Sequence, residues 1–301
     1  MQFTGIVVAN FGSAAAVMNL DDNHDTTVYR AIPLKKLELI VAGDRVTCSG
    51  PNREELRVSA LLPRDTLLAR PDRRHQLKPL AANVTLMIIV GAIVPRWETR
   101  LIDQFCVVAE NAGIEAVVLI NKTDLIASTP DPETTQDDLA DVLHRYQQVG
   151  YRTASVNATA AGGVDPLYEL IRGHTAVLVG QSGVGKSSII QHLLPDIAIR
   201  TGAISAATGV GAHTTTVSYR YELAELNAAL IDSPGVRQFP VDHLSTTDIM
   251  RGFRDIRAVA ADCRFSNCSH DHEPNCAVRH GVSTGEIDRG RFDNFLALTQ
   301  E

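Results

Sequence analysis

The 301-residue sequence has no apolar run long enough to cross a membrane. Its longest such run, LMIIVGAIVP from Leu86, is about half of the ~20 residues that a membrane-spanning helix needs, so it predicts a buried strand. The N-terminal residues MQFTGIVVANF lack both the basic segment and the cleavage site of a secretory signal. Together these absences predict a cytoplasmic protein with no membrane partner.

The sequence has few cysteines, and its acidic residues outnumber its lysines and arginines. Three of the five cysteines are crowded between positions 263 and 276, which favours a metal site over a disulfide framework in a reducing compartment. The net charge of −7 predicts that the protein as a whole repels nucleic acid. Any contact with RNA must therefore come from a local patch.

The hydrophobic pattern changes twice along the chain. Short β-rich segments separated by polar turns reach from Met1 to about Asp72 and predict a small barrel. Apolar strands then alternate with helical segments, which is typical of a parallel α/β sheet. The clearest helix is PETTQDDLADVLHRYQQVG, with Gly150 placed to end it. A helical tail with cysteines and histidines follows Pro240. The predicted domains are 1–75, 76–243 and 244–301.

The stretch GQSGVGKSS fits the phosphate-loop pattern G-x-x-x-x-G-K-[ST] and lies between an apolar strand and the helix SSIIQHLL. Lys186 can reach the β and γ oxygens of a nucleotide, and the Ser187 hydroxyl can bind Mg²⁺. Downstream, Asp232 in AALIDSPG can hold the Mg²⁺ shell, and the N–H of Gly235 can sense a γ-phosphate. The predicted phosphate-binding residues are Gly180, Gln181, Ser182, Gly183, Val184, Gly185, Lys186, Ser187 and Ser188.

The tetrapeptide NKTD indicates which base is bound. A carboxylate at Asp124 can accept two parallel hydrogen bonds from guanine, whereas adenine offers no such pair of donors. Taken alone, the tetrapeptide also fits a turn that caps a helix at Leu125. Next to a phosphate loop it predicts GTP rather than ATP. The predicted base-site residues are Asn121, Lys122, Thr123 and Asp124.

The order of these motifs is unusual, because the base-reading motif precedes the phosphate loop, whereas in Ras-like GTPases it follows. Joining the original termini and opening the chain elsewhere leaves the same sheet and site, which compact domains tolerate. Here the chain leaves the GTPase core directly after the switch at Gly235. Whatever follows is therefore tethered to an element that responds to the γ-phosphate.

The segment CRFSNCSHDHEPNC has the spacing of a tetrahedral Zn²⁺ site. Its ligand set leaves no position open for water, which predicts one structural zinc ion per chain. His272 competes for the fourth ligand position, and His280 is a lesser competitor. The predicted ligands are Cys263, Cys268, His270 and Cys276.

Taken together, these motifs resemble those of a known family, the circularly permuted GTPases called ribosome small-subunit-dependent GTPase A. The resemblance rests on LLARPD, AANV, INKTDL, VGQSGVGKSSII, HTTT, IDSPGVRQF, CRFSNCSHDHEPNCAV and GEIDRGRFDNF, in family order. It implies an N-terminal OB-fold, a permuted GTPase domain and a C-terminal zinc domain that grips small-subunit rRNA, with GTP hydrolysis stimulated by that subunit. It also places Asn157 and Ala158 in the second base-binding loop.

Catalysis requires a group that orients the attacking water. Ras-like enzymes carry a glutamine after the D-x-x-G glycine, but this chain carries the apolar Val236. His213 is the best remaining candidate, and the resemblance points to the same residue; the alternative is an exposed histidine that titrates freely. Lys186 is the second predicted catalytic residue. One threonine of Thr214, Thr215 and Thr216, with Thr215 preferred, should bind Mg²⁺.

Two arginine-rich segments are candidates for RNA contact. The first follows the barrel and is equally compatible with a solvated linker. The second lies in the tail and can instead form a stripe that covers the core. The first comprises Arg64, Arg70, Arg73, Arg74 and Lys78, and the second Arg251, Arg254, Arg257 and Arg264.

The sequence therefore predicts a monomeric, three-domain GTPase of late small-subunit maturation, whose hydrolysis is stimulated by the subunit and coupled to release from it. Its predicted partners are the small ribosomal subunit with its rRNA, and GTP or GDP with Mg²⁺. The alternative is a GTP-switched rRNA-binding module with negligible turnover, in a diverged paralogue. Thr85 and Ala212 depart from the family's usual residues, and these departures are the reason for considering that alternative.

Overall fold

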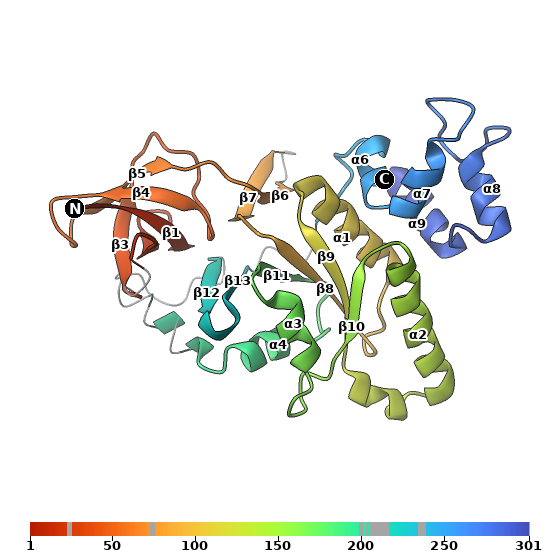
Figure 1. The fold of residues 1–301 in the computed structure, drawn as a ribbon, viewed down its shortest axis with the longest axis horizontal. Coiled ribbons are helices and arrows are strands. Elements are labelled where there is room, and N and C mark those ends of the chain that lie inside the picture. Colours follow the sequence, from red (N-terminus) through yellow and green to blue (C-terminus); the bar gives the residue numbers. More distant parts are fainter. Residues whose placement is uncertain are drawn as a thin grey trace. The chain divides into compact units, whose positions relative to one another are not determined.

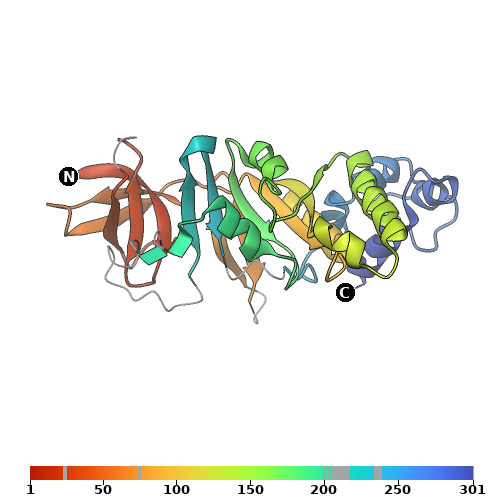
Figure 2. The same ribbon diagram turned by 90° about the horizontal axis from the view of Figure 1, so that it is seen from below.

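The structure is a computed structural model that describes residues 1–22, 26–72, 76–198, 201–202, 204, 217–233 and 239–300. Figures 1 and 2 show its ribbon from two directions. The chain forms two compact units, each assembled from segments that are distant in the sequence. Unit 1 comprises Met1–Leu86, Tyr168–Leu178 and Ser187–Arg237, and unit 2 comprises Met87–Leu167, Val179–Lys186 and Gln238–Glu301.

Unit 1 begins with a closed five-stranded barrel (Figure 1). Its strands are β1 (Gln2–Asn10), β2 (Ala15–Asn19), β3 (Val28–Pro33), β4 (Arg45–Ser49) and β5 (Leu56–Leu61). They follow the order β1-β2-β3-β5-β4, and β4 closes the barrel by pairing with β1, antiparallel, with Phe3 opposite Cys48. The barrel predicted from the short β-rich segments is thus confirmed.

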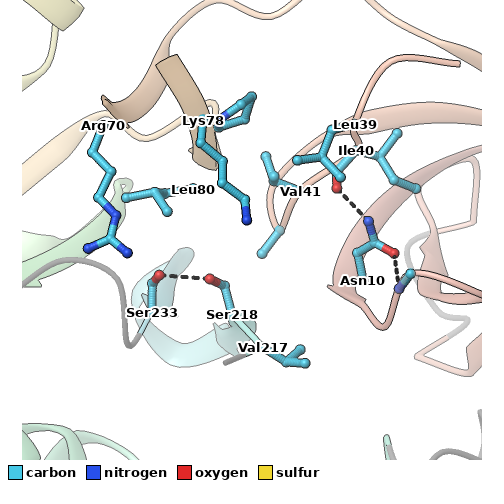
Figure 3. A pocket seen from close by; sticks show the side chains of 13 residues that line it. Asn10, Leu39, Ile40, Val41, Arg70, Lys78, Leu80, Val217, Ser218 and Ser233 are labelled. Carbon is cyan, nitrogen blue, oxygen red and sulfur yellow. Dashed lines mark hydrogen bonds between the residues drawn. The ribbon is translucent and has the colours of Figure 1, made fainter. Parts of the chain in front are cut away.

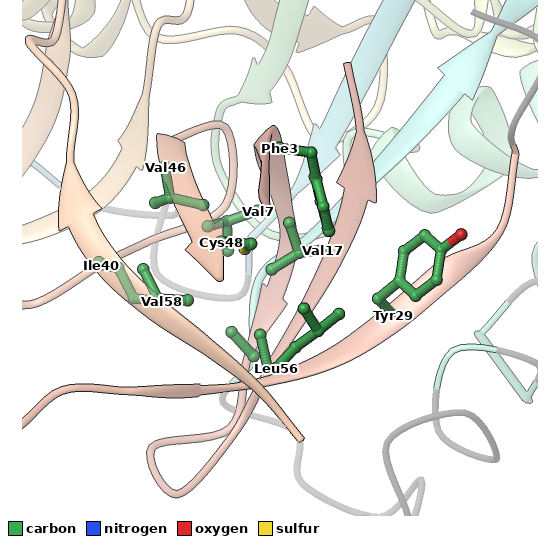
Figure 4. Close-up of a cluster of buried hydrophobic side chains, with 11 residues drawn as sticks. Phe3, Val7, Val17, Tyr29, Ile40, Val46, Cys48, Leu56 and Val58 are labelled. Carbon is green, nitrogen blue, oxygen red and sulfur yellow. The ribbon is translucent and has the colours of Figure 1, made fainter. Parts of the chain in front are cut away.

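The barrel is held by side chains that alternate along its strands. In β3, Tyr29 and Ala31 are buried whereas Arg30 between them is exposed, because successive side chains of a strand point to opposite faces. Figure 4 shows the resulting cluster, in which Phe3 packs near Tyr29 with ring centroids 5.5 Å apart. Cys48 belongs to this core, and burial raises the pKa of its thiol to about 12. This cysteine is therefore an inert core residue.

The remainder of unit 1 carries one edge of an α/β sheet. After the barrel, β6 (Leu67–Pro71) and β7 (Leu77–Ala82) form a separate antiparallel hairpin. The strands β11 (Thr175–Val179) and β13 (Ala228–Asp232) are parallel, and β12 (Tyr219–Leu223) runs antiparallel to β13. The strand β12 also pairs with β1, where Ala9 lies opposite Tyr219. Helices α3 (Asp165–Ile171) and α4 (Lys186–Leu193) flank β11 in the sequence.

Unit 2 holds the strands β8 (Leu86–Ala92), β9 (Glu115–Asn121) and β10 (Arg152–Ser155), with β9 in the middle and parallel to β10. Its helices include α1 (Thr99–Ala112) and α2 (Pro132–Gln148), with the short 3₁₀ helix η1 (Thr123–Ser128) before α2. The helix predicted most clearly from the sequence is α2. Asp131 caps its start by accepting a hydrogen bond from the Thr134 N–H, and Gly150 follows its end with φ +85°.

Four helices complete unit 2: α6 (Thr246–Arg251), α7 (Arg254–Ala260), α8 (Ala277–Thr284) and α9 (Arg289–Thr299). Helices α6 and α9 both pack on α1, and their apolar faces share one core with Val107 of that helix. The approach of α6 to α1 is close at Gly252, where a Cβ atom would come within 2.5 Å of the Val107 backbone nitrogen. None of the helices in the described part of the chain is both long and apolar enough to span a membrane.

A buried ionic network joins this helical region to α1. The guanidinium of Arg291 in α9 is fully buried and pairs with Asp103 in α1, also fully buried, and with Asp255 in α7 at 2.9 Å. Asn294 and Tyr146 donate further hydrogen bonds to Asp103, at 2.7 and 3.0 Å. The buried charges are thus paired and hydrogen-bonded on several sides, which is the condition for keeping them in a protein interior.

Candidate nucleotide and metal sites

The predicted phosphate loop joins β11 to α4 and is built around three glycines with positive φ, namely Gly180, Gly183 and Gly185. At two of them no other residue fits. A Cβ atom on Gly180 would lie 2.2 Å from the carbonyl oxygen of Val90, and one on Gly185 would lie 2.3 Å from the Asn121 side chain. The sequence pattern therefore reflects both the left-handed backbone and the close approach of neighbouring elements.

The Lys186 ammonium lies over this loop. It donates hydrogen bonds to the carbonyl oxygens of Gly180 and Gln181, at 2.6 and 2.7 Å. The lysine thus holds its charge at the centre of the loop, where the backbone N–H groups at the start of α4 also favour an anion. The Gln181 side chain leaves the loop and donates to the Arg96 carbonyl at 2.9 Å.

Asn121 connects the phosphate loop to both segments predicted to hold the base. Its amide nitrogen donates to the Val184 carbonyl at 2.9 Å, and its amide oxygen accepts from the Ala158 N–H at 3.2 Å. The side chain is 1% exposed, so these bonds are made away from solvent. Because one side chain links its own segment to two others, the three segments hold one another in place.

Lys122 and Asn157 also stabilise the loops. Lys122 adopts a left-handed backbone, with φ +64°, and its ammonium donates to the carbonyls of Gly183 and Val94, at 2.6 and 2.7 Å. The Asn157 side chain accepts hydrogen bonds from the N–H and hydroxyl of Thr159, at 3.1 and 2.7 Å. Asp124, by contrast, is exposed in the first turn of η1, where its carboxylate is open to a base.

Sequence reasoning missed the partners of these side chains. The Val94, Val156 and Val184 carbonyls and the Thr159 hydroxyl carry no pattern of their own. The Thr123 N–H and hydroxyl both approach the Val156 carbonyl at 3.3 Å. The three valine carbonyls are backbone acceptors placed by the fold, and in the sequence these valines are ordinary apolar residues.

The residues predicted to bind Mg²⁺ are described only in part. Within unit 1, Asp232 is the last residue of β13 and half-buried, and Ser187 lies in the first turn of α4. In the parallel pair of β11 and β13, Val177 lies opposite Ile231, so both strands end at the same edge of the sheet. Thr215 and Gly235, together with the predicted catalytic His213, lie outside the described residues, as do Val236 and Ala212.

The four predicted metal ligands come together between α7 and α8. Their candidate ligand atoms all lie within 4.8 Å of one another, so that this Cys₃His cluster can hold a metal ion. The Cys263 and Cys276 sulfurs are 3.9 Å apart, and each lies 3.5 Å from Nδ1 of His270. A tetrahedral zinc ion with sulfur ligands at ~2.3 Å requires sulfurs about 3.8 Å apart. The donor set and its spacing therefore fit zinc.

The backbone and the burial of the ligands prepare this cluster. His270 is 2% exposed and has a left-handed backbone, with φ +65°. Its burial lowers the pKa of the imidazole, which favours the neutral form that binds metals. The Cys276 sulfur also accepts a hydrogen bond from the Arg279 N–H at the start of α8, at 3.5 Å. The competing His272 side chain is 82% exposed and stands outside the cluster.

We expect purified protein to contain about one zinc ion per chain, and the Cys268→Ala variant to lose most of it, because three ligands hold a structural metal far less tightly than four. Elemental analysis after dialysis measures the metal, and hydrogen exchange should show α7 to α9 opening before β8 to β10. His272→Ala is the matched control and should keep its zinc. Zinc retained in Cys268→Ala, or lost in His272→Ala, would contradict the ligand set.

The fold and these loops define a class: α/β proteins with a phosphate loop, in which the base-recognition motif precedes that loop in the chain. Comparison with known proteins narrows the class. The family model described as RsgA GTPase matches residues 61–242. Because that match covers more than half of the chain, the protein belongs to the RsgA GTPase family.

Curated relatives and solved structures agree with this assignment. The small ribosomal subunit biogenesis GTPase RsgA of Chromohalobacter salexigens is 42% identical and aligns over 97% of this chain and 84% of its own length. The protein of the same name from Haemophilus influenzae is 37% identical, and the alignment covers 98% of this chain and 84% of the relative's length. The crystal structure of YjeQ from Thermotoga maritima has a TM-score of 0.80 at 25% identity, covering 100% of this chain and 98% of its own. The crystal structure of YloQ, a circularly permuted GTPase, has a TM-score of 0.77 at 24% sequence identity, and the match covers 100% of this chain and 94% of the YloQ chain. The permuted fold is thus confirmed.

Proposed function

We propose that this protein is a GTPase that acts in late maturation of the small ribosomal subunit, hydrolysing GTP to GDP and phosphate when bound to the subunit and then leaving it. The observation that supports it best is the Asn121 side chain, which ties the phosphate loop to the two base loops. The names of the curated relatives supply the biological setting. Such a function places the protein in the cytoplasm, with the subunit's rRNA and GTP or GDP as its partners.

In this proposal the residues take the roles that their sequence motifs predict. The loop from Gly180 to Ser188 binds the phosphates, with the Lys186 ammonium exchanging its carbonyl partners for phosphate oxygens. Asp124 accepts hydrogen bonds from guanine, and the loop of Asn157 and Ala158 closes over the base. Ser187, Asp232 and Thr215 would hold Mg²⁺, which neutralises phosphate charge when bound. Gly235 would approach the γ-phosphate.

The proposal also covers the domains and the zinc ion. Residues 1–75 form an OB-fold that contacts RNA, residues 76–243 the permuted GTPase domain, and residues 244–301 a zinc-binding domain. Cys263, Cys268, His270 and Cys276 hold the single structural zinc. The contacts of α9 and α6 with α1 support a close mechanical connection of the zinc domain to the GTPase domain.

Turnover of GTP with and without purified small subunits tests the function. We expect slow hydrolysis by the protein alone and strong stimulation by the subunit, because Val236 cannot position water and a second group has to be brought into place. Failure of the subunit to stimulate the wild-type protein, with GTP-dependent binding to the subunit intact, would instead indicate a nucleotide-switched RNA-binding module.

His213→Ala should lower the stimulated rate by about 100-fold or more, in the range of a lost water-positioning or acid-base group, while leaving GTP affinity and subunit binding unchanged. The measurement is single-turnover hydrolysis at saturating subunit, with co-sedimentation under a non-hydrolysable GTP analogue. His144→Ala, which removes an exposed histidine of α2, is the matched control. Equal stimulated rates in the wild type and His213→Ala would remove His213 from catalysis.

A further inference from the structure

Unit 1 has a cavity of about 420 Å³ between the barrel and the β6–β7 hairpin (Figure 3). Several of its polar side chains are engaged within the protein. Asn10 donates to the Ile40 carbonyl and Ser218 to the Ser233 hydroxyl, each at 2.7 Å, and Arg70 also has an interaction partner. Such a lining indicates no particular ligand. In unit 2, by contrast, a cluster of contacts connects the C-terminal helices to the loop proposed to cover the base.

The strand β10 leads directly to that loop. It has four residues, lies at the edge of the sheet and pairs in parallel with β9. Asn157 and Ala158 follow its end after one intervening residue. Because an edge strand has a neighbouring strand on one side only, contacts outside the sheet determine how firmly its ends are held.

Arg254, the first residue of α7, contacts the chain just before β10. Its guanidinium donates to the Gly150 carbonyl at 2.6 Å and lies over the Tyr151 ring, 4.0 Å from the ring centroid. The approach is close, since a Cβ atom on Gly150 would lie 3.3 Å from a guanidinium nitrogen. Gly150 and Tyr151 are the two residues that precede the strand. Arg254 thus holds both the backbone and the aromatic ring at the start of β10.

Helix α1 and the turn before α7 complete these contacts. Glu110 of α1 accepts a hydrogen bond from Nε of Arg254 at 2.8 Å, and the two side chains are 17% and 31% exposed. The Tyr151 hydroxyl donates to the Gly252 carbonyl at 3.1 Å, and Tyr151 is 3% exposed. A partly buried, charge-assisted hydrogen bond contributes more than an exposed ion pair. The start of β10 is therefore fixed to α1 and α7 together.

The other end of β10 meets the nucleotide loops. The Ala158 N–H donates to the Asn121 side chain at 3.2 Å, and the Asn157 N–H donates to the Gly163 carbonyl at 2.9 Å. At about 3.3 Å per residue, the strand separates these bonds from the Arg254 contacts by only about 13 Å. Short edge elements open from their ends. Loss of the contacts at the start of β10 should therefore loosen the loop at its end.

We propose that Arg254 is a positioning residue for guanine nucleotides, which holds the start of β10 and thereby keeps the Asn157 and Ala158 loop closed over the base. Helix α7 leads to the zinc ligand Cys263 three residues after its end. The zinc-binding region therefore sets how long GTP or GDP stays bound. The inference rests on the proposed function, in which this loop binds the base. By linkage, a bound nucleotide favours the docked position of Arg254 to the same extent.

Arg254→Ala should raise the dissociation constants of GTP and GDP by about 3- to 10-fold, as expected when the population of the binding-competent loop falls to about a third to a tenth. Both nucleotides should be affected equally, because they share the base. The single-turnover rate of hydrolysis at saturating GTP should not change, because the loop does not contact the reacting phosphate. Equilibrium titration without subunits measures the affinities, so contact with RNA cannot contribute to the result.

Three further variants control this measurement. Arg289→Ala removes an exposed ion pair of α9 and should keep both affinities. Arg254→Lys keeps a cation near Tyr151 but loses the planar fork, so its affinities should fall between those of Arg254→Ala and the wild type. Tyr151→Phe removes only the bond to Gly252 and replaces Arg254→Ala if that variant does not fold. Wild-type affinities in the variant used, or a loss confined to GTP, would overturn the proposal.

Hydrogen exchange of the full chain without nucleotide tests the loop directly. The Ala158 amide should exchange faster in Arg254→Ala than in the wild type, whereas the amides of the fully buried strand β8 should not. Equal acceleration in β8 would mean that Arg254 only stabilises unit 2, which would also overturn the proposal. A wild-type protein that binds no guanine nucleotide would instead refute the proposed function, and the Ala158 amide would still decide whether Arg254 holds the loop.

Discussion

Asp124→Asn is expected to weaken GTP binding by about 30- to 160-fold, which corresponds to about 2 to 3 kcal/mol for hydrogen bonds to a charged group. The variant amide presents an N–H group where the carboxylate accepts a bond from the 2-amino group of guanine, so one hydrogen bond becomes a clash of donors. Xanthine carries an oxygen at that position and should bind the variant better than the wild type.

Equilibrium titration with labelled GTP and xanthosine triphosphate measures both effects. Asp131→Asn is the matched control, because it removes the same charge from an exposed aspartate that caps α2, and asparagine caps helices equally well. It should leave both affinities unchanged. GTP affinity in Asp124→Asn equal to that of the wild type would show that this carboxylate does not read the base.

Arg291→Ala is expected to destabilise unit 2 by about 3 to 5 kcal/mol, the typical cost of removing one partner from a buried ion pair. Asp103 is fully buried and would lose its positive partner, and Asp255 would lose both of its bonds to the guanidinium. Urea unfolding measures the change. Arg289→Ala breaks an exposed pair with Asp293 and should cost less than about 1 kcal/mol.

The loss in Arg291→Ala should depend on pH. Burial raises the pKa of Asp103, and Arg291 opposes that increase. Without the arginine, folded Asp103 binds a proton more readily than the unfolded chain does, so stability falls as pH rises through the raised pKa. The difference in the free energy of unfolding between Arg291→Ala and the wild type should therefore be smaller at pH 5 than at pH 7. A pH-independent difference would mean that removing Arg291 does not raise the pKa of Asp103 further. A loss similar to that of Arg289→Ala would refute the network's importance.

The sequence predicted the elements of the fold better than it predicted their connections. The helix α2 was evident because Leu139, Val142 and Tyr146 repeat at helical spacing and are buried together. The phosphate loop and the Cys₃His cluster were evident because their chemistry requires particular residues at fixed spacing. The family resemblance supplied the OB-fold, which the barrel of five short strands fits.

The remainder depends on contacts between distant segments. Nothing in the sequence around Arg291 distinguishes it from Arg289, yet one is buried against Asp103 and the other is exposed. Likewise, the pairing of Arg70 with Lys78 depends on the hairpin register, which includes an irregularity between Leu68 and Ala69. Such features follow from tertiary packing and strand register, to which single residues contribute no pattern.

The strand β1 has a consequence for how the chain folds during synthesis. Its N-terminal half closes the barrel with β4, and Ala9 pairs with Tyr219, roughly two hundred residues later in the sequence. The barrel can therefore form soon after it leaves the ribosome, while the end of β1 keeps an unpaired edge until β12 has been made. An open strand edge readily pairs with other chains. We therefore expect nascent or truncated chains that stop before β12 to aggregate through β1, so that the last strands of unit 1 protect the first.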